Sequence, residues 1–246
     1  MIVSLGFFAL LWQLASTYIV NPAILPPPTR VAAETAELFW AAELTRHMGA
    51  SLKRVGVGLL LGSVSGIVVG LLVGRVRLVS LLVDPTVQFV RTLSPTAMIP
   101  IAIIWFGIGE ASKYFLVFWA VFFIVAVNTT AGVVATPDTR IRAAQCLGAG
   151  SFKVFTTAVL PSTVSYILAG LRLGIASAFA SIVPAEMLAA REGLGYLLQA
   201  SALFGDADRI FVALVAIAAL GFLSDWFIRY LGARPLRRFT SFHAKL

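Results

Sequence analysis

Long charge-free runs of apolar residues alternate along the chain with short polar segments. The runs cover residues 1–29, 55–74, 92–109, 114–137, 154–171 and 210–224, and the fifth continues to residue 185 with Arg172 as its only charge. Runs of about 20 apolar residues are long enough to cross the hydrocarbon core of a bilayer as helices. Proline, glycine and charged residues set the ends of the helices within these runs. The predicted helices lie near 2–20, 53–74, 86–106, 113–135, 162–183 and 208–231.

The predicted helices place the chain in the all-α class, as a polytopic membrane protein with about six transmembrane helices in a single domain over residues 1–246. The first run lacks a basic start and a small-residue cleavage pattern, so we expect a retained span rather than a signal peptide. Residues 30–50 carry interspersed acidic and basic side chains, and they predict a short amphipathic helix outside the membrane.

Composition supports this class, with 59% hydrophobic residues, 12% charged residues and a mean hydropathy of +0.94. Such values lie outside the range of soluble domains. With the amino terminus inside, ten Lys and Arg residues fall on inner segments and seven on outer ones, which favours both termini in the cytoplasm. The net charge of +8 then reflects topology and contact with anionic membrane lipid rather than nucleic-acid binding.

Residues that carry catalytic or metal chemistry are scarce. Cys146 is the one cysteine, and His47 and His243 both lie outside the predicted spans. Haem, zinc and iron-sulfur sites therefore lack ligands, and an intramembrane serine protease would lack its base. The sequence also contains no P-loop, so we expect no enzyme activity and no metal or cofactor on this chain.

Glycines recur every fourth position along the second predicted span. A stripe of small residues lets another helix approach to backbone contact, which is how helices associate where lipid offers no hydrophobic driving force. We predict helix packing through this stripe, as a static interface or as a surface that slides during gating, for Gly58, Gly62, Gly66, Gly70 and Gly74.

Proline interrupts the otherwise apolar third span at Pro95 and Pro100. Proline removes a backbone hydrogen bond, and freed carbonyls are tolerated at membrane depth only against protein or a watery cavity. The pattern is compatible with simple kinked packing or with a helix that lines a pathway. The candidates for such a lining are Pro95 and the polar residues Ser94, Thr96, Asn128, Thr129, Thr130, Ser177 and Ser181.

Two arginines fall within predicted spans. Arg172 lies near the centre of the fifth span, where a charge must face a partner or water, so it is either a pathway contact for an anion or half of an ion pair with Asp225 or Glu186. Arg91 lies near the inner end of the third predicted span. Its side chain can reach the interface, so it requires no functional role.

The polar segment 137–161 predicts a loop built around a short helix. Pro137 and Asp138 form a good helix start, and Gly148 and Gly150 can end the helix. Ile141, Ala144 and Leu147 recur at three-residue spacing and make an apolar stripe, which can bind a groove on a partner protein or pack on the chain's own domain.

Several motifs in the same order carry a family resemblance over most of the chain. They are Trp105-Phe106-Gly107-Ile108-Gly109-Glu110, Arg142-Ala143-Ala144 with Gly148, Leu160-Pro161, Ala169-Gly170-Leu171-Arg172, and Ala185-Glu186-Met187 with Gly193-Leu194-Gly195. The chain resembles a type I ABC importer permease of the group that serves nitrate, taurine and other sulfonates. The wider family often begins its loop motif with Glu, where this chain has Arg142.

The resemblance implies a multi-pass permease of the bacterial inner membrane that works as a homodimer. It implies two ABC ATPase subunits beneath the dimer, which bind ATP and magnesium, and a solute-binding protein outside. Alternating access would follow, with ATP binding opening the dimer outward and hydrolysis resetting it. The ATPase-docking residues would be Ile141, Arg142, Ala143, Ala144, Leu147, Gly148, Leu160 and Pro161.

The solute is the least determined part of this interpretation. Similarity at 141–145 and in the tail at 237–240 favours taurine or alkanesulfonates, while nitrate and a pyrimidine or riboflavin-type vitamin precursor remain alternatives. A secondary transporter driven by protons or sodium would need a midplane carboxylate, for which Asp225 is the candidate. A purely structural membrane anchor is the third alternative.

Overall fold

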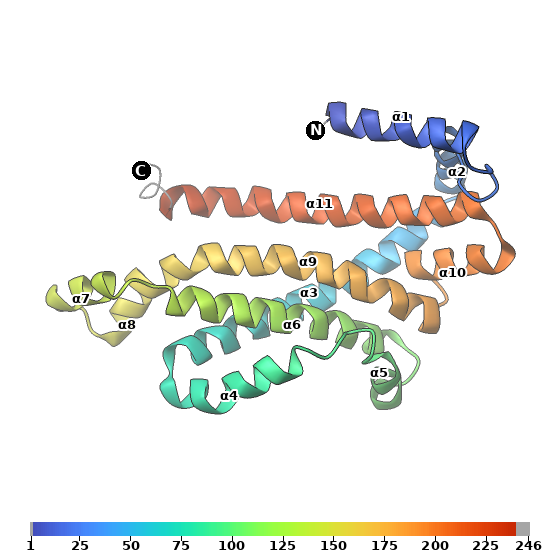
Figure 1. Cartoon of the computed structure of the whole chain (residues 1–246). Helices are drawn as coiled ribbons and strands as arrows, with labels where there is room; N and C mark the ends of the chain where they lie inside the picture. Colours follow the sequence, from blue (N-terminus) through green and yellow to red (C-terminus); the bar gives the residue numbers. More distant parts are fainter. Residues whose placement is uncertain (1, 240–246) are drawn as a thin grey trace. The chain divides into compact units, whose positions relative to one another are not determined.

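The computed structural model describes residues 2–239, with side chains placed for 6–7 and 10–230, so the tail motif at 237–240 lies outside the described side chains. This described part is helical and contains no strand (Figure 1). The helices are α1 (Ile2–Tyr18), α2 (Pro28–Trp40), α3 (Glu43–Arg75), α4 (Arg77–Val90), α5 (Ile99–Phe106), α6 (Glu110–Val134), α7 (Asp138–Cys146), α8 (Ser151–Val154), the π-helical η1 (Phe155–Val159), α9 (Leu160–Ala189), α10 (Leu194–Phe204) and α11 (Ala207–Phe239).

Contacts divide the chain into two compact units. Unit 1 comprises Met1–Lys53 and Ile182–Leu220, and unit 2 comprises Arg54–Ser181 and Gly221–Leu246. Three long helices, α3, α9 and α11, contribute residues to both units. The single transmembrane domain over 1–246 stays a prediction.

The all-α polytopic class predicted from the sequence is confirmed. Within residues 2–239, four helical stretches are long and apolar enough to cross a membrane: Glu43–Arg75, Glu110–Val134, Ser151–Ala189 and Ala207–Tyr230. They correspond to the second, fourth, fifth and sixth predicted spans. Helix α1 has 17 residues, or about 25 Å at 1.5 Å per residue, so its crossing stays a prediction.

The single helix predicted over 86–106 is wrong, because the chain leaves the helix between α4 and α5. Pro95 has no N–H to donate and also restricts Ser94 before it. The segment instead closes short turns, with the N–H groups of Ala97 and Met98 bonding the carbonyls of Ser94 and Pro95 (3.0 and 3.2 Å). Pro100 then occupies the first turn of α5, where a missing N–H costs nothing.

Residues 30–50 form two helices rather than one. The first is α2, which buries Val31 and Leu38, and residues 43–50 already belong to α3. Ion pairs join α2 to the start of α11 within unit 1: Arg30 with Asp208, and Arg209 with Glu34 (3.0 Å). The charges that suggested a free amphipathic helix therefore hold α2 in place.

Within unit 2, the glycine stripe of α3 lies against α6. A Cβ added at Gly58, Gly66 or Gly74 would lie 2.5, 3.1 and 2.6 Å from the Cβ atoms of Val117, Val125 and Val133. Gly62 and Gly70 meet Val121 and Thr129 in the same way. Both sets advance by four residues in the same direction, so α3 and α6 pack in parallel at backbone contact.

Parallel packing determines the path of the intervening chain. Arg54 of α3 bonds Glu110 at the start of α6, so the chain from Arg77 to Gly109 must return along α3. At 1.5 Å per residue, α3 from Arg54 to Arg75 measures about 32 Å, which matches the hydrocarbon core. This return path is a broken element composed of α4, residues 91–98 and α5, and its crossing of the membrane stays a prediction.

Helix α9 lies antiparallel to α6 in unit 2. Gly132 near the end of α6 meets Tyr166, whereas Gly170 and Gly174, further along α9, meet Asn128 and Val121 in turn. Helix α6 thus lies between α3 and α9, and Val117, Val121 and Val125 on it have no exposed surface. The broken element and α9 both pack beside this central helix, and this arrangement positions the candidate site.

Candidate functional site

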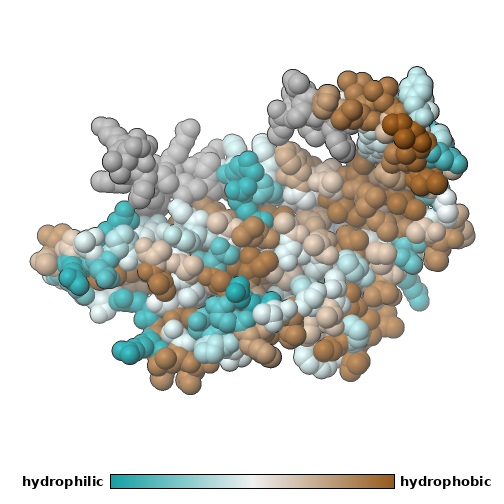
Figure 2. All heavy atoms as spheres, viewed as in Figure 1, coloured by the Kyte–Doolittle hydropathy of each residue, from teal (hydrophilic) through white to brown (hydrophobic). Residues whose placement is uncertain are grey.

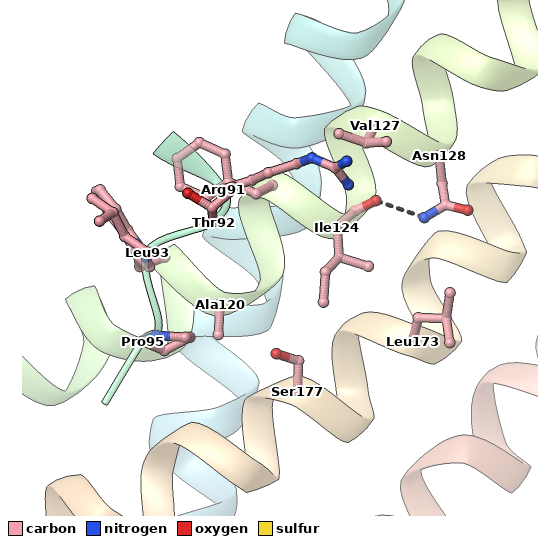
Figure 3. A pocket seen from close by; sticks show the side chains of 12 residues that line it. Arg91, Thr92, Leu93, Pro95, Ala120, Ile124, Val127, Asn128, Leu173 and Ser177 are labelled. Carbon is pink, nitrogen blue, oxygen red and sulfur yellow. Dashed lines mark hydrogen bonds between the residues drawn. The ribbon is translucent and has the colours of Figure 1, made fainter. Parts of the chain in front are cut away.

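A cavity of about 530 Å³ lies in unit 2 beside the broken element (Figure 3). Its walls are residues 91–93 and Pro95 of the broken element, six residues of α6 between Trp119 and Asn128, and Leu173 and Ser177 of α9. The non-helical residues between α4 and α5 thus form one wall of this space.

The cavity lies beside the central turns of two membrane-length helices. Phe122 is the middle residue of α6, and the lining residues Trp119 to Asn128 surround it. Leu173 and Ser177 are likewise close to the middle of α9. A solute in this space would therefore lie well inside the membrane.

Most of the lining is apolar, and Arg91 is its one charged member. Figure 3 shows the guanidinium of Arg91 extending from the broken segment toward α6, beside Val127 and Asn128. The amide nitrogen of Asn128 donates to the Ile124 carbonyl (2.8 Å), which leaves its oxygen free as an acceptor. The broken element thus places Arg91 in the cavity lining beside the central turns of α6, a position for which the sequence predicted no role.

The structure divides the predicted pathway residues into three sets. Pro95, Asn128 and Ser177 line the cavity, while Ser94 and Thr96 lie in the same loop, joined by a hydroxyl–hydroxyl hydrogen bond (2.7 Å). The third set does not line it. Thr129 is buried under Gly70, and Ser181 is buried with its hydroxyl donating to the Ala178 carbonyl (3.0 Å), so their place in a pathway stays a prediction.

Arg172 forms the ion pair that the sequence left as an alternative. Its Nε lies 2.8 Å from Oδ1 of Asp225, and Arg229 binds the other oxygen of the same carboxylate at 2.8 Å. Arg172 is also absent from the cavity lining. A role of Arg172 in the translocation pathway stays a prediction.

The predicted docking loop is an exposed corner of unit 2. No residue of α7 is buried, and Leu147 and Phe152 expose 89% and 81% of their surface. Gly148 closes the helix with φ +78°, while Gly148 N bonds Gln145 O (2.9 Å) and Ala149 N bonds Ala144 O (3.0 Å). Figure 2 shows hydrophilic side chains gathered around this end, with a hydrophobic tip among them.

The other docking candidates divide by exposure. Arg142 and Ala143 are exposed on α7, and Ile141 and Ala144 are half-buried. Leu160 and Pro161, also half-buried, begin α9 directly after η1. Arg140 of α7 donates to the Ser162 hydroxyl (3.0 Å), so the loop helix is attached to the start of α9.

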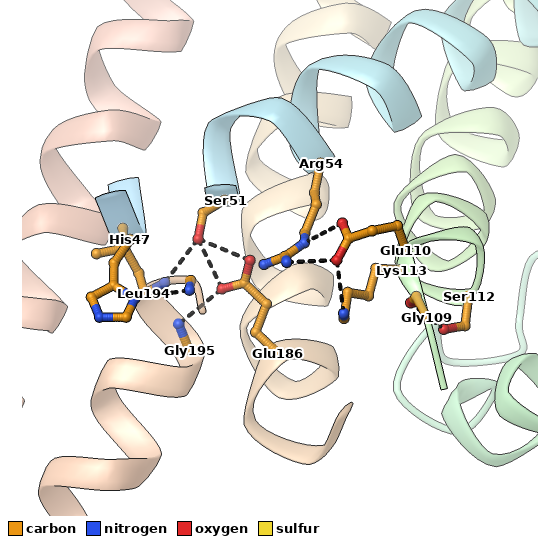
Figure 4. Close-up of polar contacts among 11 residues, drawn as sticks. His47, Ser51, Arg54, Gly109, Glu110, Ser112, Lys113, Glu186, Leu194 and Gly195 are labelled. Carbon is orange, nitrogen blue, oxygen red and sulfur yellow. Dashed lines mark hydrogen bonds and ion pairs between the residues drawn. The ribbon is translucent and has the colours of Figure 1, made fainter. Parts of the chain in front are cut away.

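A buried polar cluster in unit 1 was not anticipated from the sequence (Figure 4). The carboxylate of Glu186 accepts hydrogen bonds from the Ser51 hydroxyl (2.8 and 2.9 Å) and from Gly195 N (2.9 Å). Ser51 in turn accepts from Leu194 N (2.8 Å), and His47 Nδ1 accepts from Gly193 N (3.0 Å). The cluster holds the turn before α10, so Glu186 serves this turn and not Arg172.

We expect Gly195→Ala to weaken this turn. An alanine Cβ would lie 2.4 Å from the Val183 carbonyl, and forcing atoms into packed backbone costs about 1–3 kcal/mol. The measurement is thermal unfolding of the purified protein in detergent. Gly49→Ala, in the same unit with nothing within 4 Å of its added Cβ, is the matched control, and equal unfolding temperatures for the two variants would contradict the prediction.

A second ion cluster joins α3 to α6 in unit 2. Arg54, nearly fully buried, binds Glu110 through Nε and Nη2 (2.7 Å each), and Lys113 Nζ lies 3.0 Å from the same carboxylate. Arg54 and Lys113 are two of the seven positive residues predicted on outer segments. In the structure they are paired, which a buried charge requires.

Comparison with known proteins gives a consistent picture. The model of a family described as "Binding-protein-dependent transport system inner membrane component" matches residues 62–237. The chain is 36% identical to the taurine transport system permease protein TauC of Escherichia coli, over 99% of this chain and 90% of that protein. It is 31% identical to the nitrate import permease protein NrtB of Synechococcus elongatus, over 94% and 87%.

Solved structures agree on the fold. An inward-facing structure of the MetNI methionine ABC transporter aligns with a TM-score of 0.66 and 20% identity, covering 82% of this chain and 98% of that one. At this identity the likeness concerns the fold alone. The helices around the cavity and the exposed loop are thus arranged as in a known class of membrane protein.

Proposed function

The chain belongs to the family of binding-protein-dependent transport system inner membrane components and is a permease subunit of an ABC importer; from this premise we propose that it imports small organic sulfonates, with taurine foremost. The observation that carries the proposal is the cavity beside the central turns of α6 and α9, whose only charged lining residue is a cation. An anionic solute suits such a cavity, and similarity to a taurine permease along nearly the whole chain favours sulfonates.

Nitrate is the second candidate, since it is also a small anion and a nitrate permease is among the relatives. A neutral vitamin precursor is disfavoured by the uncompensated charge of Arg91 in the cavity. Coupling to protons or sodium is disfavoured because the carboxylate of Asp225 is occupied by Arg172 and Arg229. A protein that served only as a membrane anchor would not require a cavity beside the central turns of α6 and α9.

Energy would come from partners rather than from this chain. We propose that two ABC ATPase subunits, which bind ATP and magnesium, dock on the α7 corner of a permease homodimer embedded in lipid. The exposed Leu147 supplies an apolar contact at the tip, and Gly148 shapes the turn beside it. Both termini would then be cytoplasmic, with the solute-binding protein on the opposite face.

A continuous helical path connects the proposed docking corner to the cavity. The chain runs from α8 through η1 into α9, and α9 carries Ser177 in the cavity wall. Because Arg140 ties α7 to Ser162, displacement of α7 would pull on α9. The π-helical residues Phe155–Val159 interrupt the regular α-helical ladder, and such interruptions are frequent at functional positions.

The proposal is tested by uptake of labelled taurine in bacterial cells with and without this chain, in competition with unlabelled alkanesulfonate, nitrate and pyrimidine precursor. We expect ATP-dependent uptake that is lost on deletion and is competed by sulfonates alone. Competition by nitrate would instead indicate that nitrate is the transported solute. Uptake that persists when the partner ATPase gene is deleted would reject the importer mechanism.

A further inference from the structure

Three cations on the long helices of unit 2 are paired with carboxylates, whereas Arg91 is not. Arg54 and Lys113 share the carboxylate of Glu110, and Arg172 is paired with Asp225. The side chain of Arg91 makes no ion pair or hydrogen bond within residues 2–239. None of the residues that line its cavity is acidic. An unpaired charge at membrane depth is costly, so its retention calls for a ligand.

The position of Arg91 at the end of α4 explains only part of this arrangement. As the C-cap residue, Arg91 lies where the helix dipole favours a cation. The interaction with the helix dipole does not require the side chain to leave the helix end in any particular direction. Figure 3 shows instead that the guanidinium extends toward α6, near Val127 and Asn128, which also line the cavity. The direction of the side chain therefore points to an occupant of the cavity.

We propose that Arg91 is the anion-binding residue of the translocation pathway, where its guanidinium holds the oxyanion group of the passing solute. This inference rests on the proposed function. A planar guanidinium can donate two parallel hydrogen bonds to a sulfonate or nitrate. The Ser177 hydroxyl on the facing helix makes no hydrogen bond of its own in the described part, and it is available as a further donor.

The rest of the cavity suits the remainder of a short organic anion. Ala120, Ile124 and Leu173 present apolar walls, against which a two-carbon chain can lie. The free oxygen of Asn128 can accept a hydrogen bond from an amino group. A cationic end and an acceptor within one small cavity match an aminosulfonate better than nitrate, which has no donor for Asn128.

A phospholipid phosphate offers the same oxyanion chemistry as the solute. It would bind Arg91 permanently as a structural lipid, whereas a solute must bind and leave at each cycle. The two sources predict different results for the same variant, because a structural lipid copurifies with the protein and a transported solute does not.

The test uses the complete importer, with its ATPase and solute-binding protein, reconstituted in vesicles. ATP-dependent uptake of labelled taurine is measured over a concentration series for Arg91→Gln, Arg91→Lys and the control Arg77→Gln, which removes an exposed charge at the other end of α4. We expect Arg91→Gln to reduce uptake below saturation about tenfold or more, since a charge-assisted hydrogen bond contributes about 1.5–3 kcal/mol. Arg91→Lys should retain part of the wild-type uptake, and Arg77→Gln should retain all of it.

Two further properties of the same variants are measured as controls. Copurified ATPase and basal ATP hydrolysis should be equal in all variants, because Arg91 is not part of the docking corner and no residue of that corner lines its cavity. Phospholipid phosphorus in the protein purified in phosphate-free detergent should also be equal. Wild-type taurine uptake by Arg91→Gln, or loss of bound phosphorus in that variant, would overturn the inference. Absence of ATP-dependent uptake in the unaltered complex would instead reject the proposed function.

Discussion

Gly66→Ala is expected to destabilise unit 2 by about 1–3 kcal/mol, the cost of forcing atoms into a packed interface. The new Cβ would lie 2.8 Å from the Phe122 carbonyl and 3.1 Å from the Val125 Cβ. Neither neighbour is the end of a flexible side chain, because one is helix backbone and the other a β-branched residue with restricted χ1. The helices must therefore separate, which weakens the contacts of the adjacent glycines as well.

The measurement is thermal unfolding in detergent, where a chain of this size loses about 2–4 °C per kcal/mol. Gly56→Ala is the matched control, since it lies on the same helix and its added Cβ meets nothing within 4 Å. The control should unfold at the wild-type temperature or slightly above, because alanine favours helix. A Gly66→Ala protein as stable as the control would show that the α3–α6 contact is looser than described.

The glycine stripe shows which part of the helix packing can be predicted from the sequence. Small residues at every fourth position predict close helix packing for a physical reason that holds in any membrane protein. The partner helix was not predictable, because Val117, Val121 and Val125 are ordinary residues for any apolar span. Which apolar face fills a groove depends on the whole arrangement of helices.

The third predicted span shows a different limit. Pro95 and Pro100 predict an interruption, and the structure has one at residues 91–98, between α4 and α5. The extent of the break was not predictable, since Pro85 lies inside α4 without ending it. Whether a proline kinks or ends a helix depends on whether neighbouring groups can satisfy the freed carbonyls. Here the turns at 94–99 satisfy them locally.

The position of Arg91 is subject to the same limit. In a straight helix over 86–106 it lies near one end, whereas the broken element brings it beside the central turns of α6. The ion pair of Arg172 was correctly offered as an alternative, but the sequence alone could not select Asp225 over Glu186. Glu186 meets Ser51 across 135 positions, and no local pattern predicts contacts of that range.

Leu147→Asp is expected to abolish ATP-dependent uptake by preventing attachment of the ATPase, while the membrane helices stay folded. Leu147 has 89% of its surface exposed, so the substitution removes no packing within the chain. At a partner interface, a buried apolar anchor contributes about 2 kcal/mol or more. An unpaired carboxylate in its place adds a desolvation cost, so we expect ATPase copurification to fall by more than tenfold.

Two glycine variants separate the effect of backbone conformation at the α7 corner from the effect of added side-chain volume. Gly148→Trp and Gly150→Trp add the same side chain to the same exposed turn, and neither Cβ meets a neighbour within 4 Å. Only Gly148 has a positive φ, +78°, where a side chain is strained and the closing hydrogen bonds from Gly148 and Ala149 are disturbed. Gly148→Trp should therefore lose the ATPase more completely than Gly150→Trp. Normal copurification with both Leu147→Asp and Gly148→Trp would place the docking surface elsewhere on the chain.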